Sequence, residues 1–273
     1  MTEFQLSDSD FEKFSDLVYQ KTGINLHYGK KQLLQSRANK ILRKRGISSY
    51  REYFQIIVED KSQQELHEFI NLISTNVTHF FREEKHFQFM KEVWAPDILK
   101  RGEKNIEIWS SACSSGEEPY SIAICLKELL DGTGQKYSVF ASDISTKVLS
   151  MAQRGIYTRD RIENIPPDLV RRYFQEGRES AMGYVKLKNE IRNMVSFRRI
   201  NLIEPFTNLK TFDIIFCRNV MIYFDFPTKQ LIVEKLYHQI KPGGYLFIGH
   251  SESLNGLSTR FKYIMPATYR KEN

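Results

Sequence analysis

Residues 109–123 read WSSACSSGEEPYSIA, a run of small side chains that leads into a pair of glutamates. An apolar, strand-like stretch precedes this run. The small residues therefore fall at the carboxyl end of a predicted strand, where open α/β sheets bind ligands. The acids at the start of the next helix, Glu117 and Glu118, disfavour a pyrophosphate and suit a ligand with an ammonium group, such as the amino acid end of S-adenosylmethionine. A plain tight turn between strand and helix explains the pattern equally well.

Single polar residues end two further apolar runs. Asp143 follows the run that begins at Tyr137, and an acid in this position can accept hydrogen bonds from both ribose hydroxyls of a nucleoside. Its common structural role is to cap the next helix. Arg218 and Asn219 follow residues 212–217. They form either a buried pair that satisfies backbone groups or, as we favour at a strand end, part of a ligand site.

The segment NVTHFFR, residues 76–82, concentrates hydrogen-bonding groups around two phenylalanines. A lone histidine such as His79 is more often structural than catalytic. Arg82 has two interpretations. It forms a surface ion pair, or it holds a carboxylate through two parallel hydrogen bonds.

The first 75 residues are predicted to form a helical domain, because their apolar residues recur at the spacing of an amphipathic helix. Ser7 is a capping candidate before Phe11, and Gly23 and Gly46 are stop signals. The predicted helices cover residues 7–22, 30–45, 49–58 and 62–72.

From residue 105 onward, short apolar runs alternate with helical stretches, which is typical of an α/β protein with a doubly wound, mostly parallel sheet. The C-terminal run, residues 261–271, is expected to close the sheet as an antiparallel strand. The predicted strands cover residues 106–109, 137–141, 195–200, 212–217 and 245–249, and the predicted helices begin near 117 and cover 145–154 and 227–240. Residues 160–194 interrupt the alternation with a short helix at Pro166-Pro167 and an exposed strand at 184–188, so we expect an insertion there.

The composition is that of an ordinary globular protein, with 41% hydrophobic and 27% charged residues among 273. No apolar run approaches the roughly 18 residues that span a bilayer, and the polar N-terminus is not a secretory signal. Cys113, Cys125 and Cys217 lack metal-ligand spacing and fit reduced thiols, which predicts a cytoplasmic protein without a metal. The net charge of +7 favours an acidic partner.

Five motifs occur in order along the chain: NVTHFFRE, WSSACSSGEEPYSIA, ASDIS, FCRNVMIYFD and GGYLFIGHSES. Together with the helical N-terminus they closely resemble the CheR family of chemotaxis receptor protein-glutamate O-methyltransferases. The resemblance implies a class I S-adenosylmethionine methyltransferase fold over residues 76–273, with a small β subdomain inserted near 175–195. It also implies an all-helical substrate-recognition domain over residues 1–75. The implied cofactor is S-adenosyl-L-methionine, and the product is S-adenosyl-L-homocysteine.

The resemblance also assigns site residues. It places cofactor contacts at Asn76, Thr78, Arg82, one or both of Glu117 and Glu118, Asp143, Asn201, Leu202, Arg218 and Asn219. The sequence does not decide between the two glutamates. Methyl transfer to a carboxylate needs positioning more than a strong base. Arg82 is therefore the candidate that orients the carboxylate, and Tyr223 could donate a hydrogen bond or line the methyl channel; neither role requires a metal.

The family's substrate is the glutamate-rich methylation helix of a chemotaxis receptor, and one basic stretch fits such a partner. Between Tyr28 and Tyr50 the chain has seven basic residues and no acidic one. Arg37, Lys40 and Lys44 share one helical stripe, and we predict that it docks against the acidic helix and steers the encounter. The simpler interpretation is a solvated helix face.

Other functions and partners remain as alternatives at this point. A nucleic-acid methyltransferase is compatible with the basic charge, and a non-catalytic module could retain the cofactor fold. We expect a monomer that binds no nucleic acid and does not insert into a membrane. The turn at residues 177–183 lacks the Gly-x-Gly that some family members carry, so binding of a receptor's C-terminal tether peptide stays open.

Overall fold

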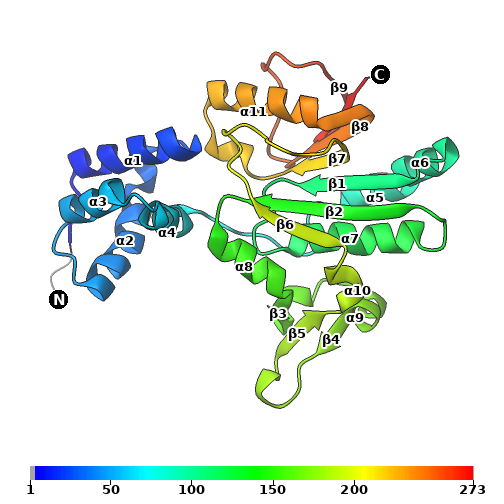
Figure 1. Ribbon diagram of the computed structural model, residues 1–273, viewed down its shortest axis with the longest axis horizontal. Helices are drawn as coiled ribbons and strands as arrows, with labels where there is room; N and C mark the ends of the chain where they lie inside the picture. Colours follow the sequence, from blue (N-terminus) through cyan, green and yellow to red (C-terminus); the bar gives the residue numbers. More distant parts are fainter. Residues whose placement is uncertain (1–3, 273) are drawn as a thin grey trace. The chain divides into compact units, whose positions relative to one another are not determined.

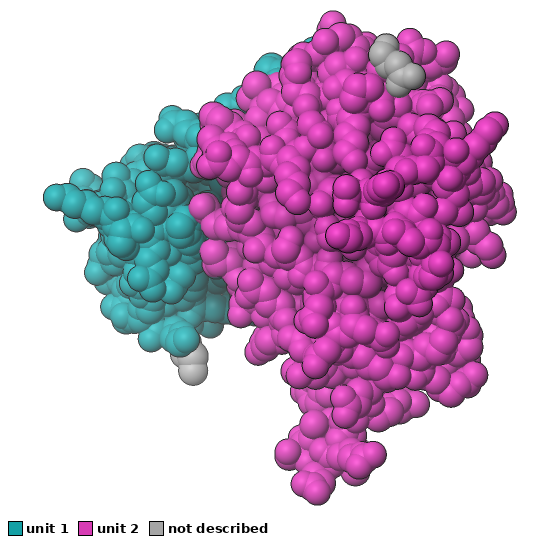
Figure 2. Space-filling view, turned by 45° about the vertical axis from the view of Figure 1, so that its right-hand side comes forward, with its two compact units in different colours: residues 1–75, 222–229 teal, residues 76–221, 230–273 magenta. Residues whose placement is uncertain are grey.

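The computed structural model describes residues 4–272, and these form two compact units (Figures 1 and 2). The first unit contains the chain up to Thr75 together with Ile222–Lys229. The second unit contains Asn76–Met221 and the residues from Gln230 onward.

The first unit is built from helices. They are α1 (Asp8–Thr22), η1 (Tyr28–Lys30), α2 (Lys31–Arg45), α3 (Tyr50–Glu59) and α4 (Gln64–Ile73). The spacing of apolar residues predicted all four α-helices to within two residues. Ser7 caps α1 by accepting the Asp10 N–H, and Gly46 ends α2 in the left-handed conformation. Phe14 lies at the centre of the core, with its ring 5.9 Å from Tyr53 and 5.1 Å from Phe69.

The second unit contains a seven-stranded sheet in the order β6-β2-β1-β7-β8-β10-β9. Its strands are β1 (Asn105–Ser110), β2 (Lys136–Asp143), β6 (Val195–Arg199), β7 (Phe212–Cys217), β8 (Ile240–Ile248), β9 (Phe261–Met265) and β10 (Thr268–Lys271). The first five strands of this order are parallel, which confirms the predicted α/β fold. β10 joins β8 antiparallel and pairs with β9, so the C-terminal run forms two strands instead of the single one predicted.

Helices cover the sheet, and α7 packs against β1, β2 and β6. The helices from Glu84 onward that lie outside the insertion are α5 (Glu84–Phe89), η2 (Met90–Trp94), α6 (Ala95–Arg101), α7 (Glu117–Leu130), α8 (Thr146–Arg154), α10 (Asn189–Arg192), η5 (Met221–Tyr223) and α11 (Phe226–Gln239). Of η5 and α11, the residues from Ile222 to Lys229 belong to the first unit. The helical stretch from Glu84 to Arg101 was not predicted. It begins without a side-chain cap, and its middle turn is a π-helix just before Pro96.

An inserted part of the chain forms a second sheet, which projects below the main one in Figure 1. Its elements are β3 (Ile156–Thr158), η3 (Arg159–Ile162), α9 (Pro167–Tyr173), β4 (Phe174–Glu176), η4 (Glu179–Ala181) and β5 (Tyr184–Leu187). β5 lies in the middle and pairs antiparallel with both β3 and β4. The insertion therefore starts well before residue 175, because β3 supplies one of its edges.

Candidate functional site

The order of the main sheet reverses at β1, since the chain proceeds to β2 and β6 on one side and to β7 and β8 on the other. The carboxyl ends of β1 and β7 thus flank the switch point, where sheets of this kind bind ligands. The small-residue run leaves β1 here. Its backbone is held on both sides, because Ser111 N–H donates to Phe216 O (2.8 Å) and Cys113 N–H donates to Ser142 O (2.9 Å).

Close packing explains the small residues of this loop. Gly116 has a φ of +101°, and a Cβ there would lie 2.8 Å from both Ala152 Cβ and the Tyr157 hydroxyl. Ser114 adopts a φ of +48°, which costs free energy for a residue with a Cβ. Phe81 and Asn219, from two other motifs, share this conformation with φ of +53° and +56°. Strained backbone therefore occurs in three of the predicted motifs, although Gln63, Glu179, Asn208 and Ala267 have a positive φ outside them.

Asp143 holds the loop from the neighbouring strand. Its Oδ2 accepts the Ser114 N–H and its Oδ1 accepts the Ser145 N–H, both at 2.9 Å. Burial raises the pKa of this carboxyl, and the backbone hydrogen bonds oppose that shift. Ser145, not Asp143, is the N-cap of α8. Each carboxylate oxygen has a second lone pair, so Asp143 can still accept donors from a ligand.

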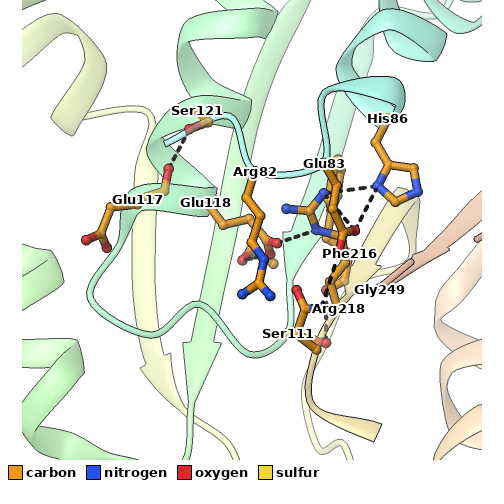
Figure 3. A network of polar contacts seen from close by, with 12 residues as sticks. Arg82, Glu83, His86, Ser111, Glu117, Glu118, Ser121, Phe216, Arg218 and Gly249 are labelled. Carbon is orange, nitrogen blue, oxygen red and sulfur yellow. Dashed lines mark hydrogen bonds and ion pairs between the residues drawn. The ribbon is translucent and has the colours of Figure 1, made fainter. Parts of the chain in front are cut away.

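A buried charge network lies beside this loop (Figure 3). Glu118 Oε2 accepts the Arg218 Nε–H at 2.7 Å, and its Oε1 accepts the Ser110 hydroxyl at 2.6 Å. Arg218 Nη1 donates to His86 Nδ1 at 3.0 Å and lies 3.5 Å from Glu83 Oε2. The Arg218 side chain is therefore paired on both sides, and it fixes Glu118 at the start of α7.

The same network continues to the C-terminal motif. Glu83 Oε1 accepts the Asn219 amide (3.2 Å) and the His250 N–H (3.1 Å), while Glu252 Oε2 accepts the backbone N–H groups of Asn219 and Gly249. Burial favours a higher pKa for the Glu83 carboxyl, but Arg218 and these donors together lower it.

Three residues of the network could offer ligand atoms to a metal ion. Those of Glu83, His86 and His250 lie within 4.8 Å of one another. The guanidinium of Arg218 already contacts the first two and supplies a positive charge there. Burial, with Arg218 beside it, lowers the pKa of His86 to about 3. Glu83 and His86 therefore belong to a hydrogen-bond network around the guanidinium of Arg218.

The NVTHFFR segment lies on the first turn of α7. The Phe81 N–H donates to Ser121 Oγ (2.8 Å), whose hydroxyl donates to Glu117 O (2.6 Å), and the Ser114 hydroxyl donates to Asn76 O (3.3 Å). Arg82 follows directly, is partly exposed, and donates from Nη1 to Val77 O at 2.9 Å.

The two glutamates of α7 point in different directions (Figure 3). Glu118 faces Arg218 and is 8% exposed, whereas Glu117 is completely buried. The Glu117 carboxylate accepts the Ser115 hydroxyl (2.6 Å) and the Arg161 Nη1–H (3.1 Å).

Asn201 and Leu202 are buried in the turn after β6. Asn201 Nδ2 donates to Glu204 Oε1 at 2.9 Å, and Lys235 Nζ donates to Leu202 O at 2.6 Å. Lys235 also lies 3.9 Å from the centre of the Phe206 ring. Burial lowers the pKa of Lys235 to about 8.

Four predicted site residues belong to the first unit. Tyr223 ends η5, and its carbonyl accepts the Asn25 N–H at 2.8 Å. Lys40 and Lys44 are exposed on α2. Arg37 is half-buried instead, and its Nη1 donates to the carbonyls of Leu72, Ile73 and Ser74 at 2.8–3.1 Å. Its charge therefore caps the C-terminus of α4.

The structure thus brings together Asn76, Ser114, Glu118, Asp143, Arg218 and Asn219 within the second unit. Sequence reasoning missed Glu83, His86, Arg161, Lys235 and Glu252. Glu83 directly follows the NVTHFFR motif, and that position was a usable signal. Nothing in the sequence connects Arg161 with Glu117, 44 residues away. Within residues 4–272, none of the helices has the length and apolar character needed to cross a bilayer.

Two family models match the chain. Residues 76–270 match the S-adenosylmethionine-binding domain of CheR methyltransferases, and residues 9–74 match their all-alpha domain. A chemotaxis protein methyltransferase of Borreliella burgdorferi is 40% identical over 97% of this chain and 95% of its own length. One of Escherichia coli is 40% identical over 96% of this chain and 90% of its own. The match to a solved SAM-dependent methyltransferase from Methanosarcina mazei spans 56% of this chain and 56% of that one, with 19% sequence identity and a TM-score of 0.33.

Proposed function

Because the chain belongs to the CheR methyltransferase family and uses S-adenosylmethionine, we propose that it methylates glutamate side chains of chemotaxis receptors. The products are glutamate methyl esters and S-adenosylhomocysteine. When bound, S-adenosylmethionine supplies a sulfonium methyl group that is already activated toward attack by a carboxylate. The observation that carries the proposal is the arrangement of Glu118, Asp143 and Arg218 around the small-residue loop at the switch point.

The residues at this loop fit the chemical groups of the cofactor. We assign Glu118 to the ammonium group of the cofactor because this residue is 8% exposed. Glu117 is buried, and its carboxylate already accepts hydrogen bonds from Ser115 and Arg161. Arg218 holds the Glu118 carboxylate in place through their charge-assisted hydrogen bond. Asp143 accepts the ribose hydroxyls with the lone pairs that the Ser114 and Ser145 amides leave.

The remaining assignments concern the residues that contact the adenine of the cofactor and those that contact the cofactor from the opposite side. Asn201 and Leu202 line the adenine. Their turn follows β6, and Lys235 of α11 anchors it by donating to Leu202 O. Asn76 and Thr78 belong to the segment that rests on α7, and they contact the cofactor from the other side.

Catalysis then depends on placing the substrate carboxylate. A glutamate is ionised near pH 7, so no strong base is needed. Arg82 orients this carboxylate through a bidentate pair, because its guanidinium retains donors beyond the single bond to Val77. Tyr223 donates a hydrogen bond or lines the methyl channel, and Tyr223→Phe should cause a partial loss of activity.

The receptor partner is recognised by the first unit. Lys40 and Lys44 present exposed charge to the acidic methylation helix, while Arg37 keeps α4 in place. Long-range attraction between the two surfaces raises the association rate. We propose that the protein acts in the cytoplasm as a monomer.

One assay separates this function from its alternatives. The protein is incubated with radiolabelled S-adenosylmethionine and either receptor or RNA, and the product is treated with mild alkali. Methyl esters release methanol under these conditions, whereas most nucleic-acid methylations are stable. Alkali-labile label on the receptor supports the proposal. Label that appears only on RNA contradicts it.

A further inference from the structure

Arg161 joins two parts of the second unit that are distant in sequence. It lies on η3 of the inserted chain, directly after β3. Its Nη1 donates to Thr78 O and to Glu117 Oε1, both at 3.1 Å. One guanidinium therefore contacts both the NVTHFFR segment and the first turn of α7.

The carboxylate that Arg161 meets is almost completely enclosed. The side chain of Glu117 is 1% exposed, while that of Arg161 is 41% exposed. An ionised carboxylate in such a place needs a cation and hydrogen bonds to offset its desolvation. Ser115 supplies a hydrogen bond and Arg161 the cation.

A second side chain of the same insertion reinforces this link. The Tyr157 hydroxyl, from β3, donates to Ser115 O at 2.8 Å. The Tyr157 ring also packs edge-on against Phe80 of the NVTHFFR segment, with ring centres 5.0 Å apart. The loop at Ser115 and Gly116 is thus supported from β3 and η3 together.

We propose that Arg161 is a positioning residue of the cofactor site, which acts by neutralising buried Glu117 and by fastening η3 to the start of α7. The effect reaches the cofactor through Glu118, the next residue in the chain. This inference rests on the proposed function for the role of the loop.

The pairing has a consequence for pH dependence. Burial raises the pKa of Glu117, and Ser115 and Arg161 oppose that shift. The other titratable groups that face Glu117 are Cys113 in the loop and Tyr157 on β3, and burial raises the pKa of both, so they stay neutral near pH 7. Removing the cation should therefore raise the folded-state pKa of Glu117 further.

The sign follows from proton linkage. A carboxyl with a raised folded-state pKa binds more protons in the folded state, so stability falls as pH rises above the ordinary value of about 4.5. Arg161→Gln should consequently be destabilised relative to wild type by an amount that grows as pH rises above this value, until Glu117 is ionised in both folded proteins. With Glu117→Gln also present, this growth should disappear.

The matched control is Arg159→Gln. Arg159 lies two residues earlier on the same 3-10 helix, but it pairs with exposed Glu176 and is 68% exposed itself. The full chain and these variants are tested by urea unfolding between pH 5 and pH 8, and by calorimetry with S-adenosylmethionine. Arg161→Lys retains the charge and should recover most of the wild-type pH profile.

We expect the dissociation constant for S-adenosylmethionine to rise about tenfold in Arg161→Gln, the size expected for one charge-assisted hydrogen bond, and to stay unchanged in Arg159→Gln. Equal affinity in these two variants would overturn the inference. So would a pH-dependent destabilisation that persists in the Glu117→Gln background. If Arg161→Gln does not fold, Arg161→Lys and the double variant decide the question. None of these measurements needs a receptor, so a failure of receptor methylation would count against the proposed function alone.

Discussion

Arg218 Nε donates a hydrogen bond of 2.7 Å to Glu118 Oε2, although only 1% and 10% of these side chains are exposed. The pair connects the end of β7 with the first turn of α7, across 100 residues of sequence. Removing two ions from water is costly, and their attraction offsets this cost only when further hydrogen bonds satisfy the remaining atoms. Ser110 makes such a bond to Glu118, and His86 accepts one from Arg218.

We expect Arg218→Gln to lower the free energy of unfolding by about 3–5 kcal/mol, because it leaves the Glu118 carboxylate buried without its cation. Combining it with Glu118→Gln should cost less than the sum of the two single variants. Urea unfolding without cofactor measures both effects. Arg260→Gln is the control, since it breaks an exposed ion pair with Glu234 and should cost less than about 1 kcal/mol. A loss as small as the control's would contradict the pairing.

Asp143→Ala should weaken S-adenosylmethionine binding by about 1–3 kcal/mol, the range for hydrogen bonds to a charged acceptor. It also releases the Ser114 and Ser145 amides, so a modest loss of stability should accompany the loss of affinity. Calorimetry on the folded variant measures the affinity, with Asp131→Ala as an exposed control. Unchanged affinity in folded Asp143→Ala would remove Asp143 from the ribose site.

His86 should make stability depend on pH. Its pKa is lowered to about 3 by burial and by Arg218, so the unfolded chain binds a proton between pH 6.5 and pH 3 that the folded chain does not. Stability contributed by neutral His86 is therefore complete above pH 6.5 and is lost as pH falls. From pH 6.5 to pH 5 this loss is up to about 2 kcal/mol, at roughly 1.4 kcal/mol per unit.

Substituting His86 with Phe tests this expectation. The ring can still stack on Phe247, whose centre lies 4.7 Å away, but it cannot bind a proton. The variant should lose a constant amount of stability because the Arg218 bond is gone, and its free energy of unfolding should vary less between pH 6.5 and pH 5. His238→Phe, at an exposed histidine, should keep the wild-type pH profile. A wild-type profile in His86→Phe as well would count against a buried neutral His86.

The strand ends of the site could be predicted because each apolar run stops at a polar residue. Asp143 and Arg218 were identified in this way, and parallel strands bring their carboxyl ends to one edge. The sequence could not give the partners of these residues. Glu118 and Glu117 are adjacent and chemically identical, yet one meets Arg218 and the other Arg161. Only the packing of α7 between the sheet and the insertion distinguishes them.

The charge pattern of α2 was likewise only partly informative. Spacing placed Arg37, Lys40 and Lys44 on one stripe, but it could not reveal that the Arg37 side chain reaches the last carbonyls of α4. A long cation can bury its stem and still find acceptors, so a basic stripe can contain a structural residue. A test of receptor docking must therefore leave Arg37 intact.

Reversing Lys40 and Lys44 to Glu should raise the KM for the receptor by about fivefold or more at low ionic strength, because attraction to the acidic helix becomes repulsion. Affinity for S-adenosylmethionine should not change, and the salt dependence of methylation should flatten. The control reverses Lys13 and Lys61, which are also exposed in the first unit, so the net charge changes equally. If both double variants show the same KM, net charge alone acts and the α2 face has no specific role. If neither KM differs from wild type, the receptor is recognised elsewhere, and the inserted sheet from Ile156 to Leu187 becomes the next surface to test.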